Sequence, residues 1–199
     1  PSLAAVRLSG EGVSGDALRQ KLAEVEDYAM GDYLTALASG LEQGGRLASQ
    51  HVADITGLPL DLVQRNFARI PTSLFAREFQ RAKGKVLSPY DGMIGTADIA
   101  PESARIAGPD PVLDRSVAAL TSAFVGYVSD ELNFHTDISY RLLNGEVTHN
   151  WDYGTTRQGY AGVMDDLQRA RPLNPALGAV IVHGHTALAT PSPALTHPV

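Results

Sequence analysis

Apolar residues near the start of the chain recur at three- and four-residue spacing, the period of an amphipathic helix. This pattern predicts a helix that begins after Ser14 or Asp16, either of which can cap it, with apolar positions at Leu18, Leu22, Val25, Tyr28 and Ala29. Gly31 interrupts the pattern, and residues 33–38 resume it up to Gly40. Two consecutive helical segments are therefore expected here.

The same period continues further along the chain. The predicted helices run over 46–55, from Pro59 to Phe67, from Pro71 past Phe79, and over 111–132. The apolar face of the last one consists of Val117, Leu120, Phe124 and Val128. We therefore expect most of residues 15–82 and 111–132 to be helical.

Two segments depart from the helical period. Residues 85–96 form two short extended pieces around Asp91-Gly92, a dipeptide typical of a tight hairpin turn. Residues 97–111 contain three prolines and are expected to form a loop.

The last part of the chain has a different pattern. A predicted helix over 160–171 leads through Pro172-Leu173-Asn174-Pro175 into the apolar run 179–183, which is typical of a buried strand. Helix, short loop and buried strand make up half of a parallel α/β unit. The predicted fold class is therefore α/β, with strands outside the helical first two thirds needed to complete the sheet.

Composition narrows the function classes. The 199 residues are 44% apolar and 19% charged, enough for a sizeable core. A net charge of −6 argues against nucleic acid as a partner, and no apolar run reaches the roughly 18 residues of a membrane span. Without cysteine the chain has neither disulfides nor thiolate metal sites.

The sequence offers few groups for catalysis. A hydrolase nucleophile is expected in a Gly-x-Ser-x-Gly turn between a strand and a helix, but residues 12–16 lack the closing glycine. We interpret Ser14 as a helix cap. His183 and His185 could share one face of a strand, but no third ligand stands at a useful spacing, and we predict no metal site. No phosphate-binding loop is present, and no cofactor is expected.

Trp151-Asp152-Tyr153 combines aromatic rings with a carboxylate, as the wall of a substrate pocket does. A turn that packs one of its aromatics on the core explains the same residues, and we favour that interpretation.

Residues 46–69 resemble a helix-turn-helix, with Gly57 in the turn. A DNA-reading helix needs cations, yet the second helix offers only Arg65 and Arg69 and also carries Asp61. We favour a structural helical hairpin. A stand-alone helical binding or regulatory module that uses this hairpin is the alternative function.

Several short motifs follow one another along the chain. They are Glu26-Asp27-Tyr28-Ala29, Asp32-Tyr33-Leu34-Thr35-Ala36-Leu37, Thr56-Gly57-Leu58, Arg69-Ile70, Phe75 with Arg81, Tyr90-Asp91-Gly92, Trp151-Asp152-Tyr153-Gly154, Asp166-Leu167, Asn174-Pro175, and residues 182–191. In their order and spacing these motifs resemble the serine carboxypeptidases of the α/β-hydrolase superfamily, specifically their bacterial branch. The resemblance covers nearly the whole chain.

The resemblance implies that residues 1–150 are mainly the helical cap over an active site, and that residues 151–199 are a partial hydrolase core. The family's nucleophile lies upstream of this region and its histidine downstream. The triad acid belongs to the loop that matches Gly184 to Pro191, where this chain has Ala187 in its place. By analogy of position, Tyr90 and, in the turn at 150–154, Trp151 are the candidate substrate-binding residues.

The implied function is the release of C-terminal residues from peptides through an acyl-enzyme. The chain by itself lacks the nucleophile, the base and the acid, so we expect it to be inactive alone. It could be a fragment, a truncated homologue, or one subunit that a second chain carrying the nucleophile completes. The resemblance favours a periplasmic or secreted parent enzyme.

Overall fold

The computed structural model describes residues 1–152, 164–178 and 183–189. By its internal contacts the chain divides into two units. The first comprises residues 1–115 together with the segment 183–189, and the second comprises the described residues between 116 and 178. The predicted boundary between cap and hydrolase core near residue 150 stays a prediction.

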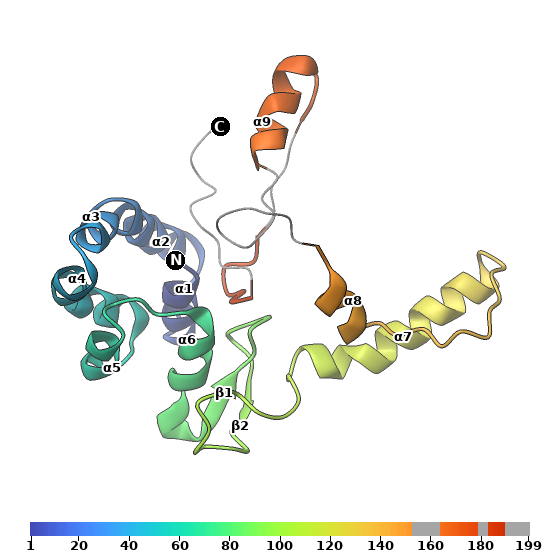
Figure 1. The fold of residues 1–199 in the computed structure, drawn as a ribbon, viewed down its shortest axis with the longest axis horizontal. Coiled ribbons are helices and arrows are strands. Elements are labelled where there is room, and N and C mark those ends of the chain that lie inside the picture. The colour runs from blue at the N-terminus through green and yellow to red at the C-terminus, as the bar shows by residue number, and fades with distance from the viewer. Residues whose placement is uncertain (153–163, 179–182, 190–199) are drawn as a thin grey trace. The chain divides into compact units, whose positions relative to one another are not determined.

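Six α-helices open the first unit (Figure 1). They are α1 (Ser2–Gly10), α2 (Gly15–Met30), α3 (Asp32–Ala38), α4 (Leu41–Thr56), α5 (Leu60–Arg65) and α6 (Thr72–Glu78). The helical prediction for residues 15–82 is confirmed, including the break at Gly31 and the start of α2 directly after Ser14. The side chain of Ser14 makes no capping hydrogen bond, so only its place at the cap position agrees with the sequence interpretation.

Periodicity did not reveal α1, because this helix has little polar face to contrast with its apolar one. It packs against α2 and α4, and its buried residues Ala4, Ala5, Val6 and Leu8 are at most 4% exposed. Small apolar side chains on several sides suit a helix that neighbours enclose. The helix therefore lies at the centre of the first unit.

The predicted hairpin follows α6 and a 3-10 turn, Arg81–Lys83. Strands β1 (Lys85–Leu87) and β2 (Gly95–Ala97) pair antiparallel, with Val86 opposite Thr96. Val86 and Leu87 are 1% exposed, and α6 packs against β1. The hairpin prediction is confirmed, and the sheet rests on the helical core.

A buried arginine holds the loop that follows β2. Arg77 of α6 is 1% exposed and pairs with Asp98 at 2.5 Å. Its guanidinium also donates to the carbonyls of Ala100, Pro101 and Ser103 at 3.0–3.2 Å. These bonds satisfy a charge that burial would otherwise penalise, and they give the proline-rich loop a defined path.

The ionisation of Asp98 follows from the same contacts. Burial of its carboxylate opposes ionisation, but hydrogen bonds from Arg77 and from the backbone of Ala100, with the charges of Arg77 and Arg81, hold its pKa below the ordinary value. Asp98 is therefore ionised in the folded protein at neutral pH.

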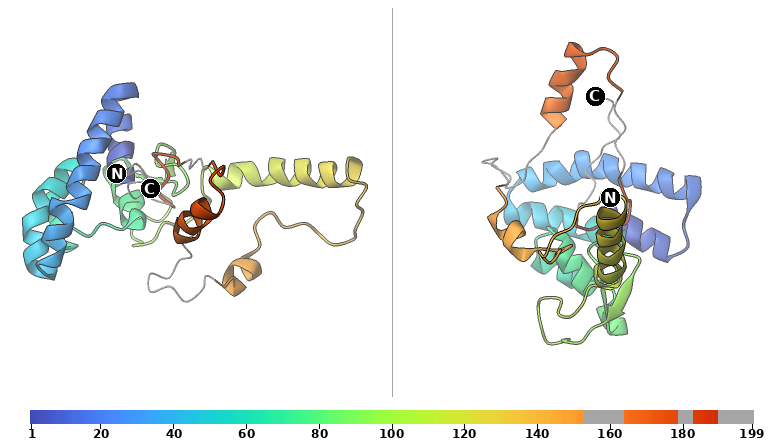
Figure 2. Two further views of the ribbon diagram at one scale, coloured as in Figure 1. Left: turned by 90° about the horizontal axis from the view of Figure 1, so that it is seen from above. Right: turned by 90° about the vertical axis from the view of Figure 1, so that its right-hand side faces the viewer.

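The second unit contains most of α7 (Leu113–Asp130), then α8 (Gly145–Asn150) and α9 (Met164–Leu173). The helical prediction for 111–132 is confirmed, and α9 falls within and just beyond the predicted helix over 160–171. Figure 2 shows α7 as a straight helix, after which the chain turns back. None of the side chains of α7 is buried.

The described residues thus form a mainly helical fold with one two-stranded antiparallel sheet. The predicted strand over 179–183 lies, except for His183, outside the described residues. The finer α/β-hydrolase assignment is taken up below as a proposal.

Candidate functional site

The turn between β1 and β2 is held by a dense set of hydrogen bonds. The backbone amide of Ser88 donates to Ile94 at 2.8 Å, and the Asp91 carboxylate accepts from the amide of Met93 at 3.0 Å. The Ser88 hydroxyl is buried, donates to Asp110 at 3.1 Å and accepts from the amide of Tyr90. The turn therefore presents its outer residues on a fixed backbone.

The segment 183–189 binds to this turn although about a hundred residues separate them in the sequence. The amides of Leu188 and Ala189 donate to the Pro89 carbonyl at 2.9 and 2.6 Å, and the Gly92 amide donates to the Thr186 carbonyl at 2.9 Å. We call residues 88–94 and 183–189 together the turn–loop junction.

Side chains strengthen the turn–loop junction. The Thr186 hydroxyl donates to Asp91 at 2.9 Å, and Leu188 is fully buried in the core cluster that includes Val6. A Cβ atom on Gly92 would lie 2.4 Å from Val6 Cγ2 and 3.3 Å from Leu188 Cδ1. Only glycine fits here, because the segment and α1 approach the turn so closely.

The turn–loop junction brings two of the sequence-predicted positions onto hydrogen-bonded segments. Tyr90 lies in the turn with 49% of its surface exposed. Ala187 lies in the loop between Thr186 and Leu188, whose backbone groups are hydrogen-bonded to the turn. Trp151 belongs to the second unit, follows α8 and is 62% exposed, so it does not pack on a core of the described residues. The favoured interpretation of the 151–153 turn as core packing is therefore not supported at Trp151.

At positions 88 and 187 the turn–loop junction does not have what acyl transfer requires. Position 187 carries a methyl group and no ionisable group. Asp110 accepts from Ser88 Oγ and from the amides of Val112 and Leu113, so Ser88 is a buried donor to a carboxylate. An activated serine needs a neighbouring base and access to substrate, and Ser88 has no access.

No protein-family model, curated protein or solved structure matches this chain. The carboxypeptidase relationship consequently stays a proposal.

Ser14, the other serine weighed as a nucleophile, follows helix α1 and the turn after it. A nucleophile elbow requires a strand before the serine, so the local structure at Ser14 does not form one.

The helix-turn-helix-like segment forms the helical hairpin that we favoured, α4 packed on α5. Gly57 ends α4 with φ 72°, a left-handed conformation that glycine adopts without strain. Helix α5 has six residues, and its Arg65 pairs with Asp61 at 3.0 Å. Short length and a self-neutralised cation suit a structural hairpin better than a groove-reading helix.

A shallow pocket of about 480 Å³ lies beside this hairpin in the first unit. The rings of Tyr28 and His51, with centroids 3.9 Å apart, form one wall, and the lining also includes the carboxylates of Glu24, Asp27 and Asp32. Burial, and then the charges of Tyr33 and Asp32, raise the pKa of Tyr28. Among the residues that the structure describes, no three His, Asp or Glu side chains are placed to hold a metal ion.

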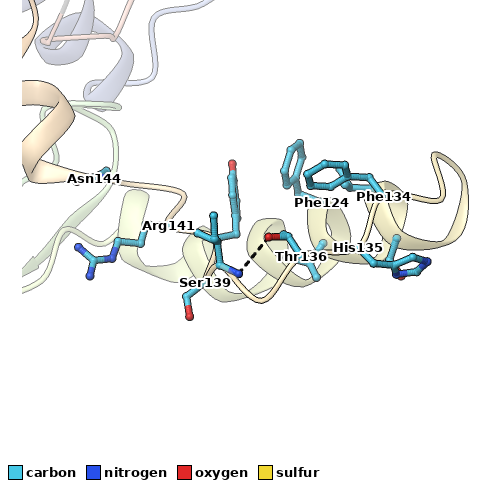
Figure 3. A pocket seen from close by; sticks show the side chains of 12 residues that line it. Phe124, Phe134, His135, Thr136, Ser139, Arg141 and Asn144 are labelled. Atoms are coloured by element: carbon cyan, nitrogen blue, oxygen red, sulfur yellow. Dashed lines mark hydrogen bonds between the residues drawn. The ribbon is translucent and has the colours of Figure 1, made fainter.

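The second unit contains a larger pocket, of about 840 Å³. Its walls are one face of α7 and the chain that returns after it, and its lining includes Phe124, Phe134, Ile138 and Tyr140 (Figure 3). Sequence analysis placed Phe124 on the apolar face of its helix but gave no sign of the returning chain.

In the described ranges, no helix has the length and apolar character to cross a membrane.

Proposed function

We propose that the chain is the cap-containing part of a serine carboxypeptidase-like hydrolase, completed by a nucleophile and a histidine from outside it. The turn–loop junction is the observation that carries this proposal. It joins the loop resembling the family's acid loop to the turn that bears Tyr90, a candidate substrate contact. A triad acid must be held rigidly, because it orients the histidine and stabilises the imidazolium.

Rigid support of the loop is what the contacts supply. Three backbone hydrogen bonds, the Thr186–Asp91 bond and the buried Leu188 all restrain the two sides of position 187. A carboxylate at that position would be held by its neighbours on the chain. These contacts support the proposal because they are of the kind that a triad acid would need, although position 187 itself carries alanine.

The exposed apolar surface of the second unit gives separate support. Large apolar side chains stay exposed along α7 and after it, including Leu120 at 54%, Tyr127 at 55% and Leu132 at 58%. A surface with many exposed apolar side chains usually marks a place where another element or molecule binds. A hydrolase sheet contributed by further chain would provide such a cover.

The alternative, a stand-alone helical module, has one observation in its favour. The first unit encloses its own core, built around Val63, Phe75 and Leu87. Such a unit could serve as a binding module without any catalytic partner.

The genomic reading frame on both sides of this segment separates the two functions. The hydrolase proposal expects a Gly-x-Ser-x-Gly elbow upstream and a histidine downstream, and a reading frame or partner chain with neither contradicts it.

A second, chemical test uses a reagent that labels activated serines. A fluorophosphonate should leave the isolated chain unlabelled and should label the upstream serine in the extended or two-chain protein. Stoichiometric labelling of Ser14 or Ser88 in the isolated chain would overturn the proposal.

Restoring the acid sharpens this test. In the extended protein, Ala187→Asp should raise kcat by up to about 10⁴-fold, the scale of loss when a triad acid is neutralised. Ala189→Asp, two residues along the same loop, is the matched control and should give no gain. Equal kcat values for the two variants would show that the loop does not carry the acid.

A further inference from the structure

The pocket of the second unit has the size and walls of a small-molecule site. Its volume of about 840 Å³ falls within the range of ligand pockets, which are mostly apolar with a few placed polar groups. Phe124 and Tyr140 stack across it with ring centroids 4.4 Å apart and an interplanar angle of 26°. The two rings bring α7 and the returning chain together.

Local hydrogen bonds form the pocket. At the end of α7, the amides of Leu132 and Phe134 donate to the carbonyls of Tyr127 and Val128 at 3.3 and 3.0 Å. Asn133 between them has φ 50°, the left-handed conformation that reverses a chain after a helix. The chain therefore runs back along α7 and carries Phe134 with it, as Figure 3 shows.

Charge selects the kind of ligand. No Asp or Glu lines this pocket, although the chain as a whole has a net charge of −6. The lining does contain Arg141 and His135, which Figure 3 shows at opposite ends of the pocket. Within the described part of the chain Arg141 has no ion pair or hydrogen bond, so its guanidinium is available.

We propose that this pocket binds a small amphipathic organic anion, an aromatic or aliphatic carboxylate. The planar guanidinium of Arg141 can take both carboxylate oxygens, and the Phe124–Tyr140 pair contacts the apolar body. This inference goes beyond the hydrolase proposal and does not depend on it, because the pocket lies wholly in the second unit.

Three probes with the same apolar body test the proposal: 4-phenylbutyrate, 4-phenylbutan-1-ol and 4-phenylbutylamine. Titration calorimetry on the full chain should find the carboxylate tightest, about fivefold tighter than the alcohol, as expected of an exposed ion pair, and the amine weakest. Arg141→Gln should lower the affinity for the carboxylate to that for the alcohol and leave the affinity for the alcohol unchanged. Phe124→Ala should weaken the binding of all three probes.

Arg115→Gln is the matched control, since Arg115 lies on α7 outside the pocket lining, and it should leave all three affinities unchanged. Far-UV circular dichroism checks that each variant keeps its helices. Equal affinities of carboxylate and alcohol, a carboxylate preference that survives Arg141→Gln, or no binding of any probe would overturn the proposal. So would concentration-dependent dimerisation that Phe124→Ala abolishes, because a second copy would then occupy the groove.

Discussion

Phe75 in the first unit and Phe124 in the second both lie on helices, yet Phe75 is fully buried and Phe124 is 45% exposed. Around Phe75, the side chains of other helices and of β1 close a core. Around Phe124 there is one stacked ring and an open pocket. The same sequence signal, an apolar residue at helical spacing, thus produces a core only where a second element covers it.

The first expected difference concerns stability. Phe75→Ala should lower the free energy of unfolding of the first unit by about 3–5 kcal/mol, since it removes a buried ring and leaves a cavity. Phe124→Ala, the same substitution on an exposed face, should cost less than about 1 kcal/mol. Urea unfolding followed by circular dichroism measures both.

Emission from Trp151 adds a check within the same experiment. Trp151 is the one tryptophan of the chain and belongs to the second unit. If the units unfold independently, Phe75→Ala should shift the dichroism transition and leave the Trp151 transition in place. If Phe75→Ala and Phe124→Ala lowered the free energy of unfolding equally, the two units would not differ in how completely they bury apolar residues.

The second expected difference concerns the effect of replacing a glycine by alanine in each unit. Gly92→Ala should destabilise the first unit by about 1–3 kcal/mol, because the new methyl group would overlap Val6 at the turn–loop junction. Gly126→Ala in α7 meets no atom within 4 Å and should stabilise its helix by about 0.5–1 kcal/mol. Hydrogen exchange of the Leu188 amide should speed up in the first variant and stay unchanged in the second. Unchanged exchange at Leu188 in Gly92→Ala would show that the close approach does not hold the loop.

The last expected difference concerns the pH dependence of stability. The pKa of Asp98 is lowered in the folded protein, so its contribution to stability is complete above the unfolded-state pKa of about 3.8 and is lost as pH falls from there through the lower folded-state pKa. Asp98→Asn should therefore flatten the decline in stability below about pH 4. Urea midpoints at pH 7, 5 and 3 measure this.

Asp61→Asn, which removes an exposed pair with Arg65, is the control for the pH experiment and should keep the acid dependence of the unaltered chain. If Asp98→Asn keeps that dependence as well, the buried pair does not contribute to acid sensitivity.

The sequence alone determined the local elements. Apolar spacing located the helices from α2 to α7, Gly31 and Gly57 marked two of their ends, and Asp91-Gly92 marked the hairpin. These features depend on neighbouring residues in the chain, so a one-dimensional pattern carries them. The sequence pattern did not predict helix α1. Neighbouring elements enclose this helix on several sides, so it lacks the polar face whose alternation with an apolar face produces a helical period.

Only the tertiary structure decided which distant segments meet. Nothing near Arg77 indicated that it would be buried against Asp98 and a loop of carbonyls, since the compensating groups lie more than twenty residues away. In the same way, the burial of Leu188 depends on Val6 and on the absence of a side chain at Gly92. Long-range packing joins residues whose separation in sequence carries no period, so their contacts appear only once the chain has folded.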